Sequence, residues 1–188
     1  IHASIIDGAR LSHATRFVFK HNDPESLEQK LKHARGNIFI AVESIYSMDG
    51  DEAPLHRICE LARQYRAAVI VDEAHATGIF GEKGRGLVPE MELCSAVFAR
   101  IVTFGKALGS HGAAVAGSSE LRSYLLNYSR SFIYTTAAPF MNHLLTQAAY
   151  HYLESTDHQE LIHERIRYFR AKIRPHKGLL PSRSAIQA

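Results

Sequence analysis

Three short apolar runs separated by helical patterns constrain the fold of this chain more than any other feature. The runs cover residues 37–43, 67–72 and 96–104, the last interrupted by Arg100. Each is a continuous apolar stretch of strand length, which is typical of strands buried in a parallel sheet. One amphipathic helical face lies between the first two runs and consists of Leu55, Ile58, Leu61, Ala62 and Tyr65. This alternation predicts an α/β fold with a mainly parallel sheet flanked by helices.

Weaker patterns fill in the remaining elements. Residues 15–20 alternate like a half-buried strand, 113–117 predict a short fourth strand, and 131–135 predict an extended piece. Four glycines within residues 77–86 indicate a loop. Further helices are predicted from Asp23-Pro24 to Gly36, from Ser118 or Ser119 to about Asn127, from Pro139 to about Ser155, and from Thr156 to about Arg174.

Composition excludes several classes of protein. Apolar residues make up 46% and charged residues 22% of the 188 positions, and the net charge is only +3 with dispersed basic residues. We therefore expect neither a nucleic-acid surface nor a polybasic membrane tail. No apolar run approaches the ~18 residues of a membrane span, so no membrane partner is expected. Cys59 and Cys94 give no disulfide framework, which favours a cytoplasmic location. Both ends of the sequence suggest a fragment of a longer chain.

Polar residues gather where the predicted strands end. Asp72 follows its apolar run directly, His75 comes three residues later, and Glu43 ends the preceding run. Because ligands of parallel sheets bind at the carboxyl ends of strands, these side chains are candidates for a site. Lys106 follows the third run and is the only charge between Arg100 and Glu120. Its own stretch favours a solvated turn lysine, but a desolvated lysine loses its proton more readily and can form an imine with a carbonyl.

Three other interpretations compete with a lysine-centred site. Asp72-Glu73 after an apolar run resembles the Walker B strand of a nucleotide hydrolase, which would also need a phosphate-binding Gly-x-x-x-x-Gly-Lys-Ser/Thr loop. The chain contains no such loop. A zinc site is the second alternative. The histidines in helical segments do not have the spacing of zinc ligands, so no metal is predicted; they are His143, His151, His158 and His163. A third possibility is a non-catalytic fragment that binds a partner chain.

Together, the lysine, the carboxylate and the histidine form the set that a pyridoxal 5′-phosphate (PLP) enzyme needs. The lysine holds the cofactor as an imine, and the carboxylate keeps the pyridine nitrogen protonated so that the ring withdraws electrons from the substrate Cα. Hydroxyls and histidines hold the ring oxygen and the phosphate. With Asp72 and His75 taken into account, an imine-forming Lys106 is favoured over a solvated turn lysine.

The sequence resembles the α-oxoamine synthases, a family of fold-type I PLP enzymes. The similar segments follow the family order over most of the chain and are residues 2–8, 19–23, 43–51, 53–55, 71–78, 84–86, 103–114 and 132–137. The resemblance implies the PLP-transferase large domain, truncated at both ends. It implies a partial PLP-binding domain over residues 1–175 and the start of a C-terminal small domain over residues 176–188, most of which is absent.

The resemblance also implies roles for individual residues. Lys106 would bind PLP and move the proton at the substrate Cα, and Asp72 would pair with the pyridinium nitrogen. His75 and Ser47 would contact the region of the ring oxygen. His2 would stack over the ring and count, with Lys106, as catalytic.

Three further positions are implied with less direct roles. Thr103 would reach the cofactor phosphate. Thr135, or alternatively Thr136, would serve the phosphate of the neighbouring subunit in a homodimer. Glu43 would support the groups that touch PLP.

The resemblance is nearest to the branch that condenses L-alanine with a pimeloyl thioester in biotin biosynthesis. Gly112-Ala-Ala stands after the lysine region, where other branches more often carry a Gly-Gly-Tyr type segment. The implied partners are L-alanine and an acyl thioester of coenzyme A or of acyl carrier protein. A glycine- or serine-using synthase is the alternative. Because the other parts of the family fold are missing, we expect no turnover by the 188-residue chain alone.

Overall fold

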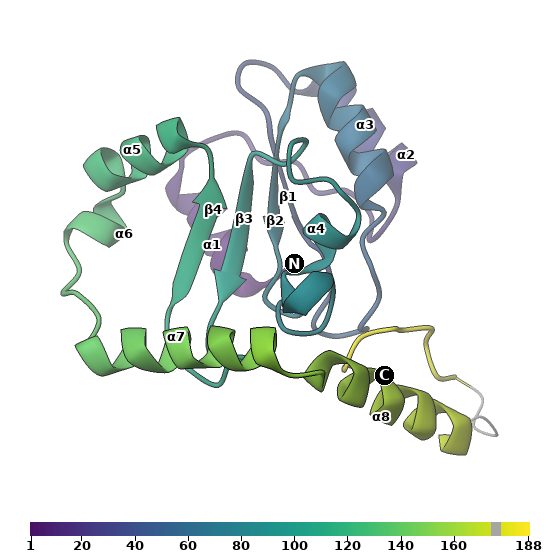
Figure 1. The fold of residues 1–188 in the computed structure, drawn as a ribbon. Helices are drawn as coiled ribbons and strands as arrows, with labels where there is room; N and C mark the ends of the chain where they lie inside the picture. Colours follow the sequence, from purple (N-terminus) through teal and green to yellow (C-terminus); the bar gives the residue numbers. More distant parts are fainter. Residues whose placement is uncertain (174–177) are drawn as a thin grey trace.

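A four-stranded sheet forms the centre of the computed structural model, which describes residues 1–173 and 178–188 (Figure 1). Its strands are β1 (Phe39–Glu43), β2 (Ala68–Asp72), β3 (Ala99–Thr103) and β4 (Ala113–Gly117), and they lie side by side in that order. The pairs β1–β2 and β2–β3 are parallel, whereas β4 runs antiparallel to β3. The prediction of a mainly parallel sheet flanked by helices is confirmed.

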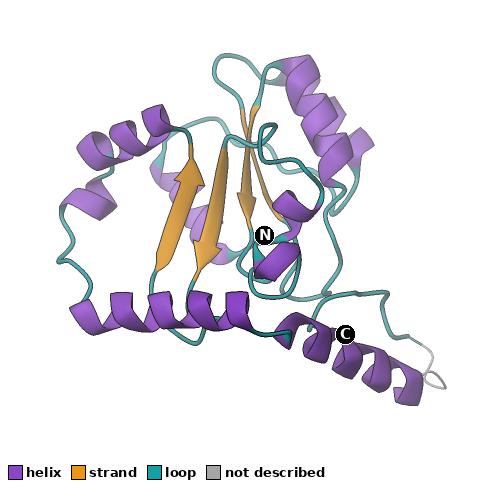
Figure 2. Cartoon of the chain, in the orientation of Figure 1, coloured by secondary structure: helices purple, strands orange, loops and turns teal. Residues whose placement is uncertain are grey.

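The helices follow the predicted alternation for most of the chain (Figure 2). They are α1 (Ala3–Leu11), α2 (Pro24–His33), α3 (Leu55–Tyr65), the 3₁₀ turn η1 (Glu82–Gly84), α4 (Leu87–Glu90), α5 (Ser119–Tyr128), α6 (Arg130–Ile133), α7 (Phe140–Ser155) and α8 (His158–Ile173). Among the described helices, none combines the length and the apolar character that a membrane span would need.

The hydrophobic core lies between β1 and β2 and the helices α2 and α3. Helix α2 begins where the Asp23 carboxylate accepts a hydrogen bond from the Ser26 amide at 2.8 Å and Pro24 occupies the first helical position. Its Leu27 and Leu31 are buried against the core. Helix α3 buries the face predicted from its spacing and ends at Arg66 in the left-handed conformation, with φ of 53°. Burial of each such aliphatic side chain stabilises the fold by roughly 1.5–3 kcal/mol.

Strand β4 and the helices that follow it are far less covered. Every residue of β4 is exposed, and α5, α6 and α7 contain no buried residue. In Figure 1 the long helix α7 runs beneath the lower ends of β3 and β4, and α8 extends from it to the lower right. The core is thus concentrated in the half of the molecule that holds β1, β2, α2 and α3.

The prediction of a strand over residues 15–20 was wrong. This stretch has no regular structure, and Phe17 and Val18 are exposed. The Lys20 amide donates to the hydroxyl of Ser26 at 3.1 Å instead of to a neighbouring strand. An alternating pattern specifies which side chains share a face, but a strand also needs the edge of a partner strand.

The extended piece predicted over residues 131–135 was also wrong, because residues 130–133 form the short helix α6. Local bonds satisfy its backbone, with the Tyr134 amide donating to the carbonyl of Arg130 at 3.0 Å. The third strand was predicted to begin at residue 96, but β3 begins at Ala99. Helices α1 and α4 were not predicted. The predicted helix end at Arg174 and the predicted domain boundary between 175 and 176 lie outside the described residues.

Candidate active site

The parallel strands bring their terminal acidic residues to one edge of the sheet. In the β1–β2 register Glu43 is opposite Asp72, and both carboxylates are buried. The Asp72 Oδ1 atom accepts a hydrogen bond from the Ala74 amide at 2.9 Å, which starts the turn that carries His75. The Ser44 amide donates to the Asp72 carbonyl at 2.8 Å, so the two chain segments stay joined beyond the strands. The predicted gathering of strand-end residues is therefore present.

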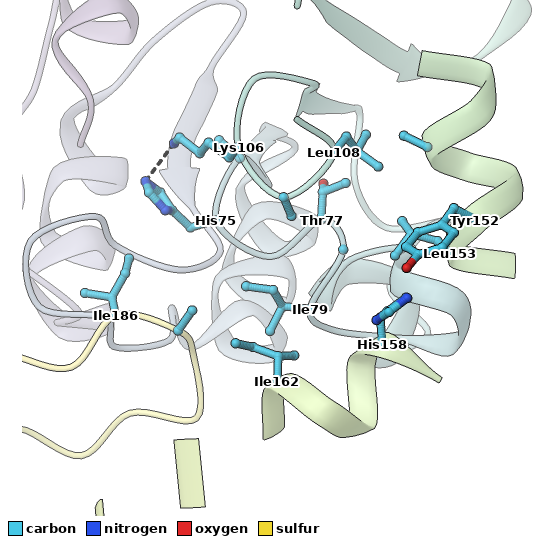
Figure 3. A pocket seen from close by; sticks show the side chains of 15 residues that line it. His75, Thr77, Ile79, Lys106, Leu108, Tyr152, Leu153, His158, Ile162 and Ile186 are labelled. Atoms are coloured by element: carbon cyan, nitrogen blue, oxygen red, sulfur yellow. Dashed lines mark hydrogen bonds between the residues drawn. The ribbon is translucent and has the colours of Figure 1, made fainter. Parts of the chain in front are cut away.

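Lys106 lies against His75, with the Lys106 Nζ atom 2.6 Å from His75 Nε2 (Figure 3). Burial lowers the pKa of Lys106, while the charges of Asp72 and Glu43 oppose that shift. Burial also lowers the pKa of His75, and the neighbouring Lys106 lowers it further. A neutral His75 accepts a hydrogen bond from the lysine ammonium, and the lowered pKa makes the neutral amine more available as a nucleophile.

Thr103 ends β3, one strand away from Asp72. Its Oγ1 atom is buried and has no hydrogen-bond partner among the described residues. Leaving a buried hydroxyl unpaired costs about 1–3 kcal/mol. Such an atom at the rim of a site is best explained by an oxygen-rich ligand that accepts its hydrogen bond, and the phosphate predicted for this position has that chemistry.

The other predicted site residues differ in how near they lie to Lys106. His2 caps α1 by accepting a hydrogen bond from the Ser4 amide at 3.3 Å, and it is close enough to His75 to contribute to lowering its pKa. Ser47 lies half-buried in the turn between β1 and α3. Thr135 is exposed in the connection between α6 and α7, where its hydroxyl donates to the Ser131 carbonyl at 2.5 Å. The structure thus groups His2 with the strand ends and places Thr135 on the outer surface.

Glu73, the neighbour of Asp72, is fully buried in an ion pair that the sequence did not reveal. Its Oε2 atom accepts from Arg100 Nε at 2.9 Å, and its Oε1 atom accepts from the Val88 amide at 2.7 Å. Arg100 also donates to the Arg85 carbonyl at 2.6 Å. Because this carboxylate is already neutralised and hydrogen-bonded, the geometry does not favour a metal-binding Walker B role. The signal was a charged residue inside an apolar strand, which indicates a buried partner.

A cavity of about 570 Å³ opens beside Lys106 and His75 (Figure 3). Its other walls are mostly apolar and include Leu108, Tyr152, Ile162 and Ile186. Helix α8 is held against the glycine-containing loop by Gln159, whose Nε2 atom donates to the carbonyls of Ile79 and Gly81 at 3.0 and 2.7 Å. The lysine therefore faces a space large enough for a small-molecule substrate.

One group of His and Asp side chains among the described residues is close enough to share a metal ion, although no metal was predicted. It comprises His21, Asp49 and Asp51. His21 Nε2 lies 2.7 Å from Asp51 Oδ2, and Asn22 Nδ2 donates to the same oxygen at 2.6 Å. These direct hydrogen bonds account for the grouping and join residues 21–22 to the loop between β1 and α3.

The sequence profile described as "Aminotransferase class I and II" matches residues 1–187. An 8-amino-7-oxononanoate synthase of Emericella nidulans is 44% identical over 179 residues, which cover 87% of this chain and 43% of that protein. The chain therefore spans less than half of the length of that relative.

Solved structures with the same architecture include two that cover most of the chain. A serine palmitoyltransferase from S. paucimobilis with bound PLP-myriocin is 29% identical with a TM-score of 0.93, over 100% of this chain and 50% of that one. An 8-amino-7-oxononanoate synthase from Francisella tularensis is 30% identical with a TM-score of 0.79, over 93% of this chain and 51% of that one. The fold is that of fold-type I PLP enzymes.

Proposed function

The chain belongs to the aminotransferase class I and II family, on its α-oxoamine synthase branch, and from this membership we propose that it forms the cofactor-binding part of a PLP-dependent 8-amino-7-oxononanoate synthase. One observation carries the proposal: Lys106, with a lowered pKa, is hydrogen-bonded to His75 at the strand end that holds Asp72. A lysine that merely solvates the surface would need neither the contact with His75 nor the neighbouring carboxylates of Asp72 and Glu43.

The residues at the strand ends fit PLP in their chemistry. Lys106 is the covalent attachment point, and the buried carboxylate of Asp72 is suited to keep the ring nitrogen protonated. His75 offers a hydrogen bond to the ring oxygen. The unpaired hydroxyl of Thr103 is suited to donate to the phosphate. Bound PLP supplies an electron sink for the substrate Cα.

Three other residues complete the proposed site. We assign His2 to the face of the cofactor ring, because its α1 segment lies beside His75. Ser47 approaches from the turn after β1. Glu43, buried opposite Asp72, supports the positive charge of Lys106 and raises the pKa that burial lowers.

The proposed reaction joins L-alanine to a pimeloyl thioester of coenzyme A or of acyl carrier protein. Lys106 removes the proton from the alanine Cα, which then forms a bond to the thioester carbonyl carbon as the thiol leaves. Loss of the alanine carboxylate as CO₂ gives 8-amino-7-oxononanoate. The names of the sequence relatives support alanine as the amino acid. The likeness to serine palmitoyltransferases keeps a serine- or glycine-using synthase as the second candidate.

We further propose that this chain works within a longer protein. Residues 1–175 would belong to its large domain and residues 176–188 would begin its small domain. That protein would act as a homodimer in the cytoplasm, where Cys59 and Cys94 remain thiols. The 188-residue chain alone would not turn over, because its relatives are more than twice as long.

Absorbance and borohydride reduction test the role of Lys106. Purified protein should show the visible band of lysine-bound PLP, and mass spectrometry after reduction should locate the cofactor on Lys106. Lys106→Ala should lose the band, whereas Lys172→Ala, on the exposed surface of α8, should keep it. Wild-type protein without such a band would contradict the cofactor assignment.

A substrate comparison with the longer protein that contains this chain tests the amino acid and the acyl donor. Alanine, glycine and serine should each be offered with pimeloyl and palmitoyl thioesters, and the condensed product identified by mass spectrometry. We expect alanine with the pimeloyl thioester to give the highest kcat/KM. Faster turnover of serine or glycine would replace the proposed substrate with the second candidate and leave the PLP chemistry in place.

A further inference from the structure

The segment 178–188 packs back onto the loops at the strand ends. Ser182 Oγ donates a hydrogen bond to the Gly50 carbonyl at 2.6 Å, and Ser184 Oγ donates to the same oxygen at 3.2 Å. Ser184 is only 1% exposed. Two hydroxyls on one carbonyl tie this segment to the loop between β1 and α3, the loop that also carries Ser47.

Arg183 joins that loop to the end of helix α4. Its Nε and Nη2 atoms bind the two carboxylate oxygens of Glu52 at 2.7 and 2.8 Å, and its Nη1 atom lies 3.1 Å from Glu90 Oε1. The guanidinium also lies over the Phe80 ring, 5.2 Å from its centroid. Hydrogen bonding to Glu52 raises the pKa of Arg183 and keeps it charged. A guanidinium that binds both oxygens of a carboxylate fixes the orientation of the two side chains, which the single ammonium group of a lysine does less well.

Gly50 allows the close approach of the two segments. Its φ is +70°, and a Cβ atom there would clash with the Ile186 carbonyl and would lie 2.9 Å from Ser182 Oγ. The contact between residue 50 and residues 182–186 is therefore a backbone-to-backbone fit. Its position depends on the bonds made by Ser182, Arg183 and Ser184.

The same short segment lines the cavity beside Lys106. Ala185 and Ile186 are part of its wall, on the side where Figure 3 shows Ile186 below His75. On the far side from Ile186, Figure 3 shows Leu108 and Tyr152. Because only Ser184 separates Arg183 from Ala185 and Ile186, and Ser184 is itself bonded to Gly50, the ion pairs of Arg183 help to determine where this wall stands relative to the lysine.

We propose that residues 182–186 form the wall that the aliphatic acyl chain contacts, with Ile186 limiting the chain that fits and Arg183 as the positioning residue. The apolar lining suits an alkyl chain, and the lysine and histidine stand at one end of the cavity, where the reacting thioester carbonyl would lie. The identity of the ligand as an acyl thioester rests on the proposed function. The position of the wall is independent of that function, because it follows from the contacts of residues 182–186.

Hydrogen–deuterium exchange tests the positioning role without any catalytic assay. In Arg183→Gln, exchange should rise several-fold in peptides that cover residues 49–53 and 178–188, because three charge-assisted contacts are lost. Arg183→Lys should restore part of the protection. Arg167→Gln is the matched control, since Arg167 makes an exposed ion pair with Glu160 at 2.6 Å on α8. Unchanged exchange in Arg183→Gln would overturn the proposal.

Steady-state kinetics of the longer protein that contains this chain test the specificity role. Arg183→Gln should raise KM for the acyl thioester about tenfold, with an unchanged PLP absorbance band and little change in KM for the amino acid. Ile186→Ala should shift the preference toward longer or branched acyl chains, and Ile186→Phe toward shorter ones. An equal rise of both KM values, or the same chain preference in all Ile186 variants, would refute it. Absence of PLP binding in wild type would refute the proposed function, while the exchange data would still decide the position of the wall.

Discussion

The surroundings of Lys106 determine what its amine can do. Lys106 and Lys172 both lie at the surface, but Lys106 touches the His75 imidazole and stands within the influence of Asp72 and Glu43. Burial lowers the pKa of Lys106 from its ordinary 10.5, and Glu43 and Asp72 limit that shift. A lower pKa means a larger neutral fraction at any given pH, and only the neutral amine attacks a carbonyl.

The rate of PLP capture should therefore rise with pH through a midpoint below 10.5. Glu43→Gln removes a charge that raises the pKa of Lys106, so the midpoint should move to a still lower pH. Stopped-flow absorbance across a pH series measures both midpoints, and Glu160→Gln, exposed on α8, serves as a control. A midpoint that rises in Glu43→Gln would show that the carboxylate does not act on the lysine through its charge.

Thr103→Val should separate cofactor binding from stability. The Thr103 hydroxyl has no hydrogen-bond partner within residues 1–173 and 178–188, so valine should leave the stability of the cofactor-free form unchanged or higher. The same change should weaken PLP by about 1.5 kcal/mol, roughly tenfold in Kd. Thr77→Val is the contrast, because the Thr77 hydroxyl donates to the Glu73 carbonyl at 3.0 Å and its loss should lower stability. Fluorescence titration and thermal melts give the two quantities, and an unchanged Kd for Thr103→Val would remove Thr103 from the phosphate site.

At the level of elements, local patterns identified those whose burial is regular. The helical spacing of α3 and the apolar runs of β1 and β2 were sufficient to predict these elements. In each of them the apolar positions of the sequence are the ones that the core buries. The pattern at residues 15–20 was insufficient because alternation does not supply a partner, and this stretch pairs with neither outer strand of the sheet, β1 or β4. Helix α1 was missed because its N-cap is His2, which is not one of the residues that usually mark a helix start.

The Glu73–Arg100 pair shows a dependence between elements that no local pattern contains. Gly86 precedes α4 with φ of +113°, and a Cβ atom there would overlap the Glu73 carboxylate. Gly86→Ala should therefore disturb the buried pair and destabilise the protein by about 3–5 kcal/mol. Gly36→Ala is the matched control, because Gly36 also has a positive φ of +75° but has open space around it. It should cost only about 1 kcal/mol. Urea unfolding of both variants measures the difference, and equal losses would show that backbone strain alone is responsible.

At the level of the whole molecule, the sequence predicted the sheet class and which residues meet at its edge. It could not predict the surface that a second chain would cover. Large apolar side chains are exposed along β4, α5, α6 and α7, and they include Val115, Tyr124, Phe132, Tyr134, Phe140 and Leu145. Exposed apolar area of this extent is typical of an interaction surface. It agrees with the proposed homodimer, in which a second copy would bury these helices.

The exposed position of Thr135 in this region makes that homodimer testable through the cofactor. Its hydroxyl is bonded to the Ser131 carbonyl on the outer surface, so we expect it to reach the PLP phosphate of the other subunit. Lys106→Ala dimers should bind no PLP covalently, and Thr135→Val dimers should bind it weakly. If Thr135 acts across the interface, unfolding and refolding the two variants together should create one intact site in each mixed dimer, with Lys106 from one subunit and Thr135 from the other. If Thr135 acts within its own subunit, mixing should restore none. Titration of the lysine-bound PLP band distinguishes these results, and Thr135→Val dimers that bind PLP as tightly as the wild type would show that Thr135 has no part in the site.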